Sequence, residues 1–141
     1  MIPSRRFVLL ASVALIPSIA RASPSEVAAL VHAFAGETRI QDAVLKLDLP
    51  VLVENGNAVA MTVSALDPPS PIVEIQVYAE SNPLPNVVTF RFGPRSGAPK
   101  VSTRIRLATS QTVIALARSR DGAIWRDSVE LLVTLAACME G

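Results

Sequence analysis

A helical pattern of apolar residues opens the part of the chain that we expect to fold. Apolar residues recur three and four positions apart, at Val27, Leu30, Val31 and Phe34. The preceding Ser23-Pro24-Ser25-Glu26 is a capping box with proline at the first helical position, and Gly36 supplies a stop signal. The pattern predicts a short amphipathic helix with His32 off its apolar face. A second, weaker helical stretch is predicted over residues 38–45.

After Pro50, apolar residues alternate with polar ones or form short runs, which is the pattern of β-strands. The segment VLVENGNAVAMTVSA predicts a hairpin, because Asn55-Gly56 can supply the backbone conformation of a tight turn. Further strands are predicted over residues 72–80, 87–92, 101–107, 112–118 and 124–135. About seven short strands predict a mainly β domain, an immunoglobulin-like β-sandwich with a short N-terminal helical segment. A jelly roll or a small barrel is the structural alternative.

The alternation also predicts which strand residues face the core. Residues 101, 103, 105 and 107 would share one face, and the alternating residues of 129–135 would share another. Trp125 would pack in the core without a neighbouring disulfide, because the chain has one cysteine. On the outer faces, Arg104 and Arg106 could form an anion patch, although a solvated face is the simpler interpretation. Asp127 and Glu130 are likewise interpreted as solvated charges.

The first 22 residues have the layout of a bacterial export signal. A basic stretch with Arg5 and Arg6 precedes an apolar run over residues 7–19, and Ala20-Arg21-Ala22 is a small-x-small site that predicts cleavage after Ala22. The apolar run is shorter than the ~20 residues that a membrane span needs. The paired arginines favour the twin-arginine route, with an ordinary secretory leader as the alternative. An uncleaved leader is the other outcome.

Removing this leader changes the charge of the chain. The whole sequence has 13 Lys and Arg against 12 Asp and Glu, and the leader holds three of the arginines. The mature chain is therefore slightly acidic, which excludes a basic nucleic-acid-binding domain. Its 119 residues suit one domain with one core, and no later apolar run approaches membrane length. We expect an exported domain with no membrane span in the mature chain.

The sequence contains little that predicts catalysis. It has no Ser-His-Asp or Cys-His spacing, no glycine-rich phosphate loop and no cluster of metal ligands. A metal role for the single histidine, His32, is not expected. The chain is therefore predicted to have no active site of its own, and Cys138 is its one chemical handle.

Cys138 lies directly after the last predicted strand, three residues beyond Leu135. A single cysteine in an exported protein is either a site of intermolecular pairing or a reactive thiol. A buried structural cysteine is the ordinary alternative, but residues beyond the last strand have little chain left to form another core element. Three extended residues reach about 10 Å past the strand end. This position predicts a flexible arm that can present the thiol to another protein.

Five segments occur together in this chain: LDLPVLVENGNAVAMTV, YAESNPLPNVVTFRF, VSTRIRLATSQTVIALA, DGAIW and the one-cysteine tail. In this order they resemble the SoxY family of the periplasmic thiosulfate-oxidising system. The resemblance implies an immunoglobulin-like domain that pairs with SoxZ, a second sandwich protein, and leaves the cell with it by the twin-arginine route. It also implies that Cys138 carries a covalent thiosulfate or persulfide adduct, with no other cofactor. Separate haem-containing and hydrolytic Sox-type enzymes would attach, hydrolyse and oxidise the sulfur.

The tail departs from the family pattern. The family tail is typically Gly-Gly-Cys-Gly-Gly, whereas this chain has Ala136, Ala137, Cys138, Met139 and Glu140, with Gly141 as one residue extra. Glycine makes an arm slim and conformationally free, so the bulkier tail puts entry into the usual enzymes' channels in question.

The predicted organisation is an export signal over residues 1–22, a helical segment over 23–49, the sandwich over 50–135 and a carrier arm over 136–141. Two functions remain open at this stage. One is a sulfur-compound carrier in the periplasm that is not itself an enzyme. The other is a non-catalytic immunoglobulin-like binding module of a related redox system, in which Cys138 is not used for sulfur transfer.

Overall fold

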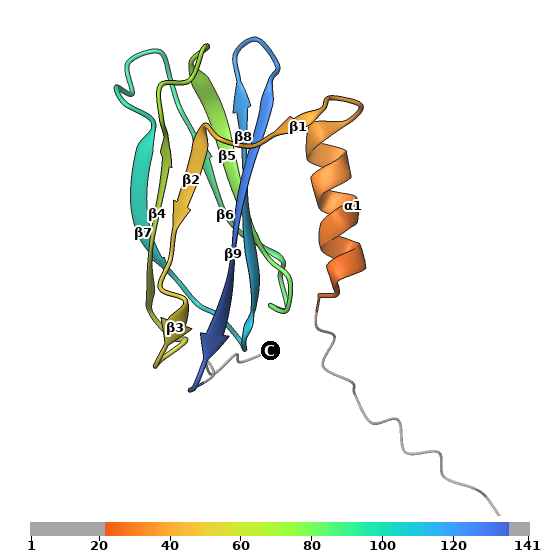
Figure 1. Cartoon of the computed structure of the whole chain (residues 1–141), viewed down its shortest axis with the longest axis vertical. Coiled ribbons are helices and arrows are strands. Elements are labelled where there is room, and N and C mark those ends of the chain that lie inside the picture. The colour runs from red at the N-terminus through yellow and green to blue at the C-terminus, as the bar shows by residue number, and fades with distance from the viewer. Residues whose placement is uncertain (1–21, 136–141) are drawn as a thin grey trace, which may run out of the picture.

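A computed structural model describes residues 22–135 of the chain as one α-helix followed by two packed β-sheets (Figure 1). The helix is α1 (Pro24–Ala35). The strands are β1 (Ile40–Gln41), β2 (Leu45–Asp48), β3 (Leu52–Val53), β4 (Val59–Ala65), β5 (Ile72–Ala79), β6 (Asn86–Arg91), β7 (Lys100–Ile105), β8 (Gln111–Ser119) and β9 (Ile124–Val133). The described part of the chain therefore has the predicted sandwich, with two of its strands only two residues long.

The larger sheet has the strand order β1-β9-β8-β5-β6, and β3 also pairs with β9. The smaller sheet has the order β2-β4-β7. Most pairs are antiparallel, but β1 and β3 both run parallel to β9. They pair with opposite ends of β9, because Ile40 lies beside Ile124 and Leu52 lies beside Leu132. The long last strand thus joins segments that are far apart in the sequence.

The core lies between the two sheets and is built from the alternating apolar residues. Side chains with no exposed surface come from both layers and include Val63, Ile75, Val77, Leu107, Val113 and Ala115. Trp125 is 7% exposed and belongs to this core, as predicted. Its indole N–H has no hydrogen-bond partner among the described residues, which is uncommon for a buried donor.

Helix α1 packs against the outer face of the larger sheet. Val27, Phe34 and Ala35 are buried there against three residues of the sheet, Tyr78, Leu116 and Ile124. Both halves of the predicted capping box form: the Glu26 N–H donates to the Ser23 hydroxyl at 3.4 Å, and the Ser23 N–H donates to the Glu26 carboxylate at 2.8 Å. Gly36 ends the helix with φ of 59°, a conformation that favours glycine.

Arg118 of β8 fastens the other end of the helix. Its guanidinium lies 4.2 Å from the centre of the Phe34 ring and donates to the Phe34 carbonyl oxygen at 2.6 Å. The same group donates to the Glu74 carboxylate of β5 at 3.1 Å. The helix is therefore held on the sheet by apolar contact along its length and by one cation at its C-terminal end.

Two local predictions are wrong. The second helical stretch over residues 38–45 is absent, because β1 pairs with β9 and β2 begins at Leu45 and pairs with β4. The predicted hairpin is also absent, because β3 pairs with β9 instead of β4. Asn55 still makes a turn, in which its side-chain oxygen accepts from the Asn57 N–H at 3.0 Å. In both cases, pairing with a distant strand overrides the local pattern.

Candidate functional site at the end of the last strand

The two ends of the sandwich are built differently. One end carries the β4–β5, β6–β7 and β8–β9 loops. The other carries the β5–β6 and β7–β8 loops, the segment between β3 and β4, and the end of β9 that leads to Cys138 (Figure 1). The candidate functional site is therefore the surface around the end of β9, which we call the arm exit.

On one side, β9 is held at the arm exit by β3 and the turn that follows it. The Leu132 N–H donates to the Val51 carbonyl oxygen at 2.8 Å, and the Thr134 N–H donates to that of Val53 at 2.9 Å. The Thr134 hydroxyl donates to the Glu54 carbonyl oxygen at 3.2 Å. The chain is therefore anchored as far as Thr134, four residues before Cys138.

Gly56 extends this anchor to the last described residue. Its N–H donates to the Leu135 carbonyl oxygen at 2.9 Å, and its own carbonyl oxygen accepts from the Leu107 N–H at 2.8 Å. Gly56 is buried. It links the end of the chain to the end of the smaller sheet, because Leu107 follows β7.

On the other side, a side chain replaces the β8–β9 ladder where that ladder ends. The last paired residues are Gln111 and Leu131. Two residues further along β9, the Val133 N–H donates to the Ser110 hydroxyl oxygen at 2.8 Å. Ser110 thus satisfies a backbone donor that β8 does not reach.

The loop that holds Ser110 is fixed by two buried amide side chains, Asn82 and Gln111. The Asn82 side-chain oxygen accepts from the Ala108 N–H at 2.9 Å and from the Gln111 amide at 3.0 Å. The Asn82 amide donates to the Arg106 carbonyl oxygen at 2.8 Å. Buried amide side chains whose donors and acceptors are hydrogen-bonded hold a loop in one conformation. The β7–β8 loop therefore has a defined position beside β9.

Most of the sequence-predicted site residues lie outside the described part of the chain. These are Arg5, Arg6 and Ala20 of the export signal, and Ala136, Ala137, Cys138, Met139, Glu140 and Gly141 of the arm. Ala22 is described: its side chain is buried, and its N–H donates to the Asn82 carbonyl oxygen at 3.1 Å. Cleavage after Ala22 would remove this hydrogen bond and leave the Ser23 nitrogen beside the Glu26 carboxylate.

The predicted surface charges fall into two groups. Arg104, Arg106, Glu130 and His32 are exposed, as the alternation and the helical pattern indicate. Asp127 is different, because it lies on the core-facing side of β9 and its carboxylate accepts from the Leu47 N–H at 2.7 Å. The interpretation of Asp127 as a solvated charge is wrong. Its odd-numbered position, in phase with Val129 and Leu131, was the sequence signal that could have shown this.

Asn82, Ser110 and Gln111 were not singled out by sequence reasoning. Asn82 lies in a proline-rich loop and Ser110 in a polar one, where such residues ordinarily make turns. The residues around them in the sequence do not indicate that their side chains make these contacts. These side chains support the arm exit only because the β5–β6 loop lies against the β7–β8 loop and the start of β8.

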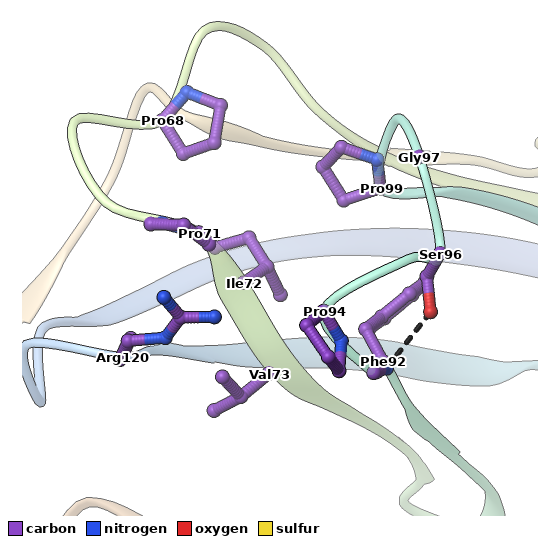
Figure 2. Close-up of a pocket in the computed structure, with 11 residues that line it drawn as sticks. Pro68, Pro71, Ile72, Val73, Phe92, Pro94, Ser96, Gly97, Pro99 and Arg120 are labelled. Carbon is purple, nitrogen blue, oxygen red and sulfur yellow. Dashed lines mark hydrogen bonds between the residues drawn. The ribbon is translucent and has the colours of Figure 1, made fainter.

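A separate pocket lies at the opposite end of the sandwich (Figure 2). Its volume is about 380 Å³, and its lining includes Pro68, Pro71, Phe92, Pro94, Pro99 and Arg120. The β4–β5 and β6–β7 loops form most of its wall, and Ser96 stabilises one of them by accepting from the Gly93 N–H at 2.8 Å. This pocket is remote from the arm exit, so it does not belong to the candidate site.

Within residues 22–135, no three His, Cys, Asp or Glu side chains lie together as a metal site would require. Across the same residues, none of the helices has the length and hydrophobicity of a membrane span. What the arm exit can do is fix the starting point of the segment that carries Cys138.

The described residues form an immunoglobulin-like sandwich whose chain is anchored as far as Leu135, three residues before Cys138 in the sequence. The chain matches the family described as "Sulfur oxidation protein SoxY" over residues 31–138. It belongs to the SoxY family, as the sequence resemblance implied. The match begins inside α1 and ends at Cys138, which leaves residues 139–141 beyond it. No curated protein sequence matches the chain.

One solved structure supports this assignment, and others show the same fold. The sulfur carrier protein SoxY from Chlorobium limicola f thiosulfatophilum is 28% identical, with a TM-score of 0.67 over 80% of this chain and 100% of that one. A superoxide reductase (neelaredoxin) variant from Ignicoccus hospitalis is 21% identical, with a TM-score of 0.56 over 75% of this chain and 86% of that one. A putative superoxide reductase from Thermotoga maritima is also 21% identical, with a TM-score of 0.57 over 68% and 93%. The two reductases share the fold.

Proposed function

We propose that this protein carries sulfur covalently on Cys138 and presents it to separate enzymes. Membership of the SoxY family and the likeness to a solved sulfur carrier support a role in sulfur oxidation. The observation that carries the proposal is the anchoring of the end of the chain, which is held on the Ser110 side as far as Val133 and on the Gly56 side as far as Leu135, three residues before Cys138. Because the chain is anchored as far as Leu135, the three residues that follow can carry Cys138 no more than about 10 Å from the arm exit.

The proposed chemistry needs partners. Joining the Cys138 thiol to thiosulfate forms an S–S bond, which removes two electrons and the thiol proton. A haem-containing enzyme would accept those electrons. A hydrolytic enzyme would then add water to the terminal sulfonate sulfur, which breaks its S–S bond, releases sulfate and leaves a protonated persulfide on Cys138. The carrier itself supplies only the thiol and its position.

We also propose that the protein is exported and works as a heterodimer. The Arg5-Arg6 pair supports the twin-arginine route to the periplasm, with cleavage after Ala22. Family membership supports pairing with a SoxZ-like sandwich subunit. Periplasmic protein should begin at Ser23 and elute with that subunit as a 1:1 complex in gel filtration. A Met1 N-terminus on membrane-held protein would contradict the cleavage.

The test of the carrier function is the intact mass of the protein after incubation with thiosulfate and the purified haem-containing enzyme. The wild type should gain one thiosulfate adduct, and Cys138→Ser should gain none. Both should melt at the same temperature, because the last strand of the sandwich ends at Val133, five residues before Cys138. A wild type without adduct, or a Cys138→Ser protein that melts several degrees lower, would instead favour a binding module with a structural cysteine.

A further inference from the structure

An apolar surface surrounds the arm exit. Six large apolar side chains are strongly exposed among the described residues, and four of them, Val51, Leu52, Leu132 and Leu135, come from β3, the end of β9 and the residues next to them. We call these four residues the exit patch. Exposed apolar residues that are scattered need no explanation, but a group at one site indicates an interaction surface.

The centre of the exit patch is the pair formed by Leu52 and Leu132. They are direct partners in the β3–β9 register, so their side chains stand next to each other on one side of the sheet. Leu52 is 57% exposed and Leu132 is 62% exposed, whereas the next partner on β3, Val53, is 5% exposed. The two strands thus turn Val53 toward the core and the leucine pair outward.

Acidic residues flank this pair along both strands. Glu54 lies two residues after Leu52, and Glu130 lies two residues before Leu132. Glu130 lies in β9 and by alternation points to the same side as Leu132, whereas Glu54 directly follows the end of β3. Both glutamates are exposed. A partner of this surface should therefore present apolar side chains at its centre and basic side chains at its edge.

The distance to Cys138 identifies the partner. Cys138 follows Leu135 by three residues, so it stays within about 10 Å of the patch in any conformation of the arm. An enzyme that takes Cys138 into its active site must bring the rim of that site onto the residues around the arm exit. We propose that the exit patch is the docking surface for the enzymes that act on Cys138. This inference rests on the proposed carrier function.

The test compares three variants, which differ in where the substitutions lie and in whether they keep the surface apolar. Leu52→Ser with Leu132→Ser removes the centre of the patch. Leu66→Ser removes a leucine that is 56% exposed in the β4–β5 loop, at the opposite end of the sandwich. Leu52→Met with Leu132→Met keeps the patch apolar. All the substituted side chains are exposed, so each protein should fold and melt like the wild type.

Each protein is tested as its complex with the SoxZ-like subunit, with thiosulfate and the purified haem-containing enzyme, and adduct formation is followed by intact mass. We expect the double serine variant to lose about tenfold or more in kcat/KM, mainly through KM, which corresponds to about 1.4 kcal/mol of docking energy. Leu66→Ser and the double methionine variant should match the wild type. Equal kcat/KM for all four proteins would overturn the docking surface and leave the carrier function intact.

Other occupants of the patch give different results. If the arm itself covers the patch, the double serine variant will change the rate at which iodoacetamide alkylates Cys138. If the SoxZ-like subunit covers it, the variant will lose that subunit in gel filtration. If a second copy covers it, a wild-type dimer will become a monomer. Each of these would overturn the inference, whereas a wild type that forms no adduct at all would overturn the proposed function beneath it.

Discussion

The carboxylate of Asp127 in β9 accepts a 2.7 Å hydrogen bond from the backbone N–H of Leu47 in β2. The two residues are 80 positions apart and belong to different sheets. This bond ties the edge of one layer of the sandwich to the edge of the other. A charged acceptor pairs here with a backbone donor, an interaction worth about 1.5–3 kcal/mol when it is shielded from water.

We therefore predict that Asp127→Ala lowers the free energy of unfolding by about 1.5–3 kcal/mol, because the Leu47 N–H loses its partner. Asp127→Asn should cost less, since its amide oxygen can still accept. The measurement is urea unfolding followed by the fluorescence of Trp125, the one tryptophan in the sequence. Glu130→Ala, at an exposed position of the same strand, is the control and should change stability by less than about 0.5 kcal/mol. Equal effects at the two positions would rule out a bridging role for Asp127.

Asn82 offers a second test of buried polar contacts. Asn82→Ala leaves the Ala108 N–H and the Arg106 carbonyl oxygen without this partner. It also removes one of the two acceptors of the Gln111 amide, which keeps its hydrogen bond to the Thr109 carbonyl oxygen. We predict a loss of at least about 2 kcal/mol in the free energy of unfolding.

Asn86 is the matched control for this experiment. It lies just beyond the same loop, at the start of β6, but it is exposed and its side-chain contacts are as long as 3.4 and 3.5 Å. Asn86→Ala should therefore be close to neutral in the same urea titration. An Asn82→Ala protein as stable as Asn86→Ala would mean that water replaces the lost contacts.

Ser110 should act locally. Ser110→Ala removes the acceptor of the Val133 N–H, while β3 still holds the other side of β9. We predict faster hydrogen exchange at Val133, by about tenfold for the ~1–1.5 kcal/mol that one hydrogen bond contributes. Exchange at Val113, in the middle of β8, should be unchanged. A uniform acceleration across both strands would show that Ser110 stabilises the whole domain instead of the arm exit.

Tyr78 predicts a pH dependence. Burial raises the pKa of the Tyr78 phenol above its ordinary value of 10.0, the Glu74 carboxylate adds to this rise, and the Arg118 guanidinium opposes it. The folded protein therefore resists deprotonation. The stability that this provides is fully present below pH 10, the unfolded value, and is lost as the pH rises through the higher folded value.

The measurement is the tyrosinate absorbance, because Tyr78 is the one tyrosine in the sequence. The folded protein should titrate above pH 10, and the protein in concentrated urea should titrate near it. Glu74→Gln should move the folded transition to lower pH. Identical titrations in buffer and in urea would contradict the burial of the phenol.

The altered tail gives the last prediction. Ala136→Gly with Ala137→Gly restores the glycines that the family resemblance places before the cysteine. Glycine is slimmer and conformationally freer, so adduct formation on Cys138 should be unchanged or faster. The measurement is kcat/KM with the haem-containing enzyme, alongside Met139→Gly with Glu140→Gly to separate the two sides of Cys138. Slower turnover in the first variant would show that the partner enzymes are adapted to alanine.

Interactions between near neighbours could be predicted from the sequence alone. The capping box, the start of α1 and its end at Gly36 depend on residues three or four positions apart. The later strands follow from alternation, and so does the core position of Trp125. The SoxY resemblance also lies in the sequence itself, because it depends on several segments in the right order. These features need no knowledge of which strand lies beside which.

Tertiary structure decided the rest, because it depends on contacts between distant residues. The ENGN segment predicts a hairpin turn. In the structure β3 instead pairs with β9, and Leu52 lies beside Leu132, which is 80 positions away in the sequence. Asp127 has the same charge as exposed Glu130, but it is partly buried and accepts a hydrogen bond because β2 brings the Leu47 N–H to it. The arm exit forms where β3, the segment between β3 and β4, and the β7–β8 loop contact the end of β9. A local sequence pattern cannot predict these contacts, because the free energy of long-range strand pairing outweighs local preference.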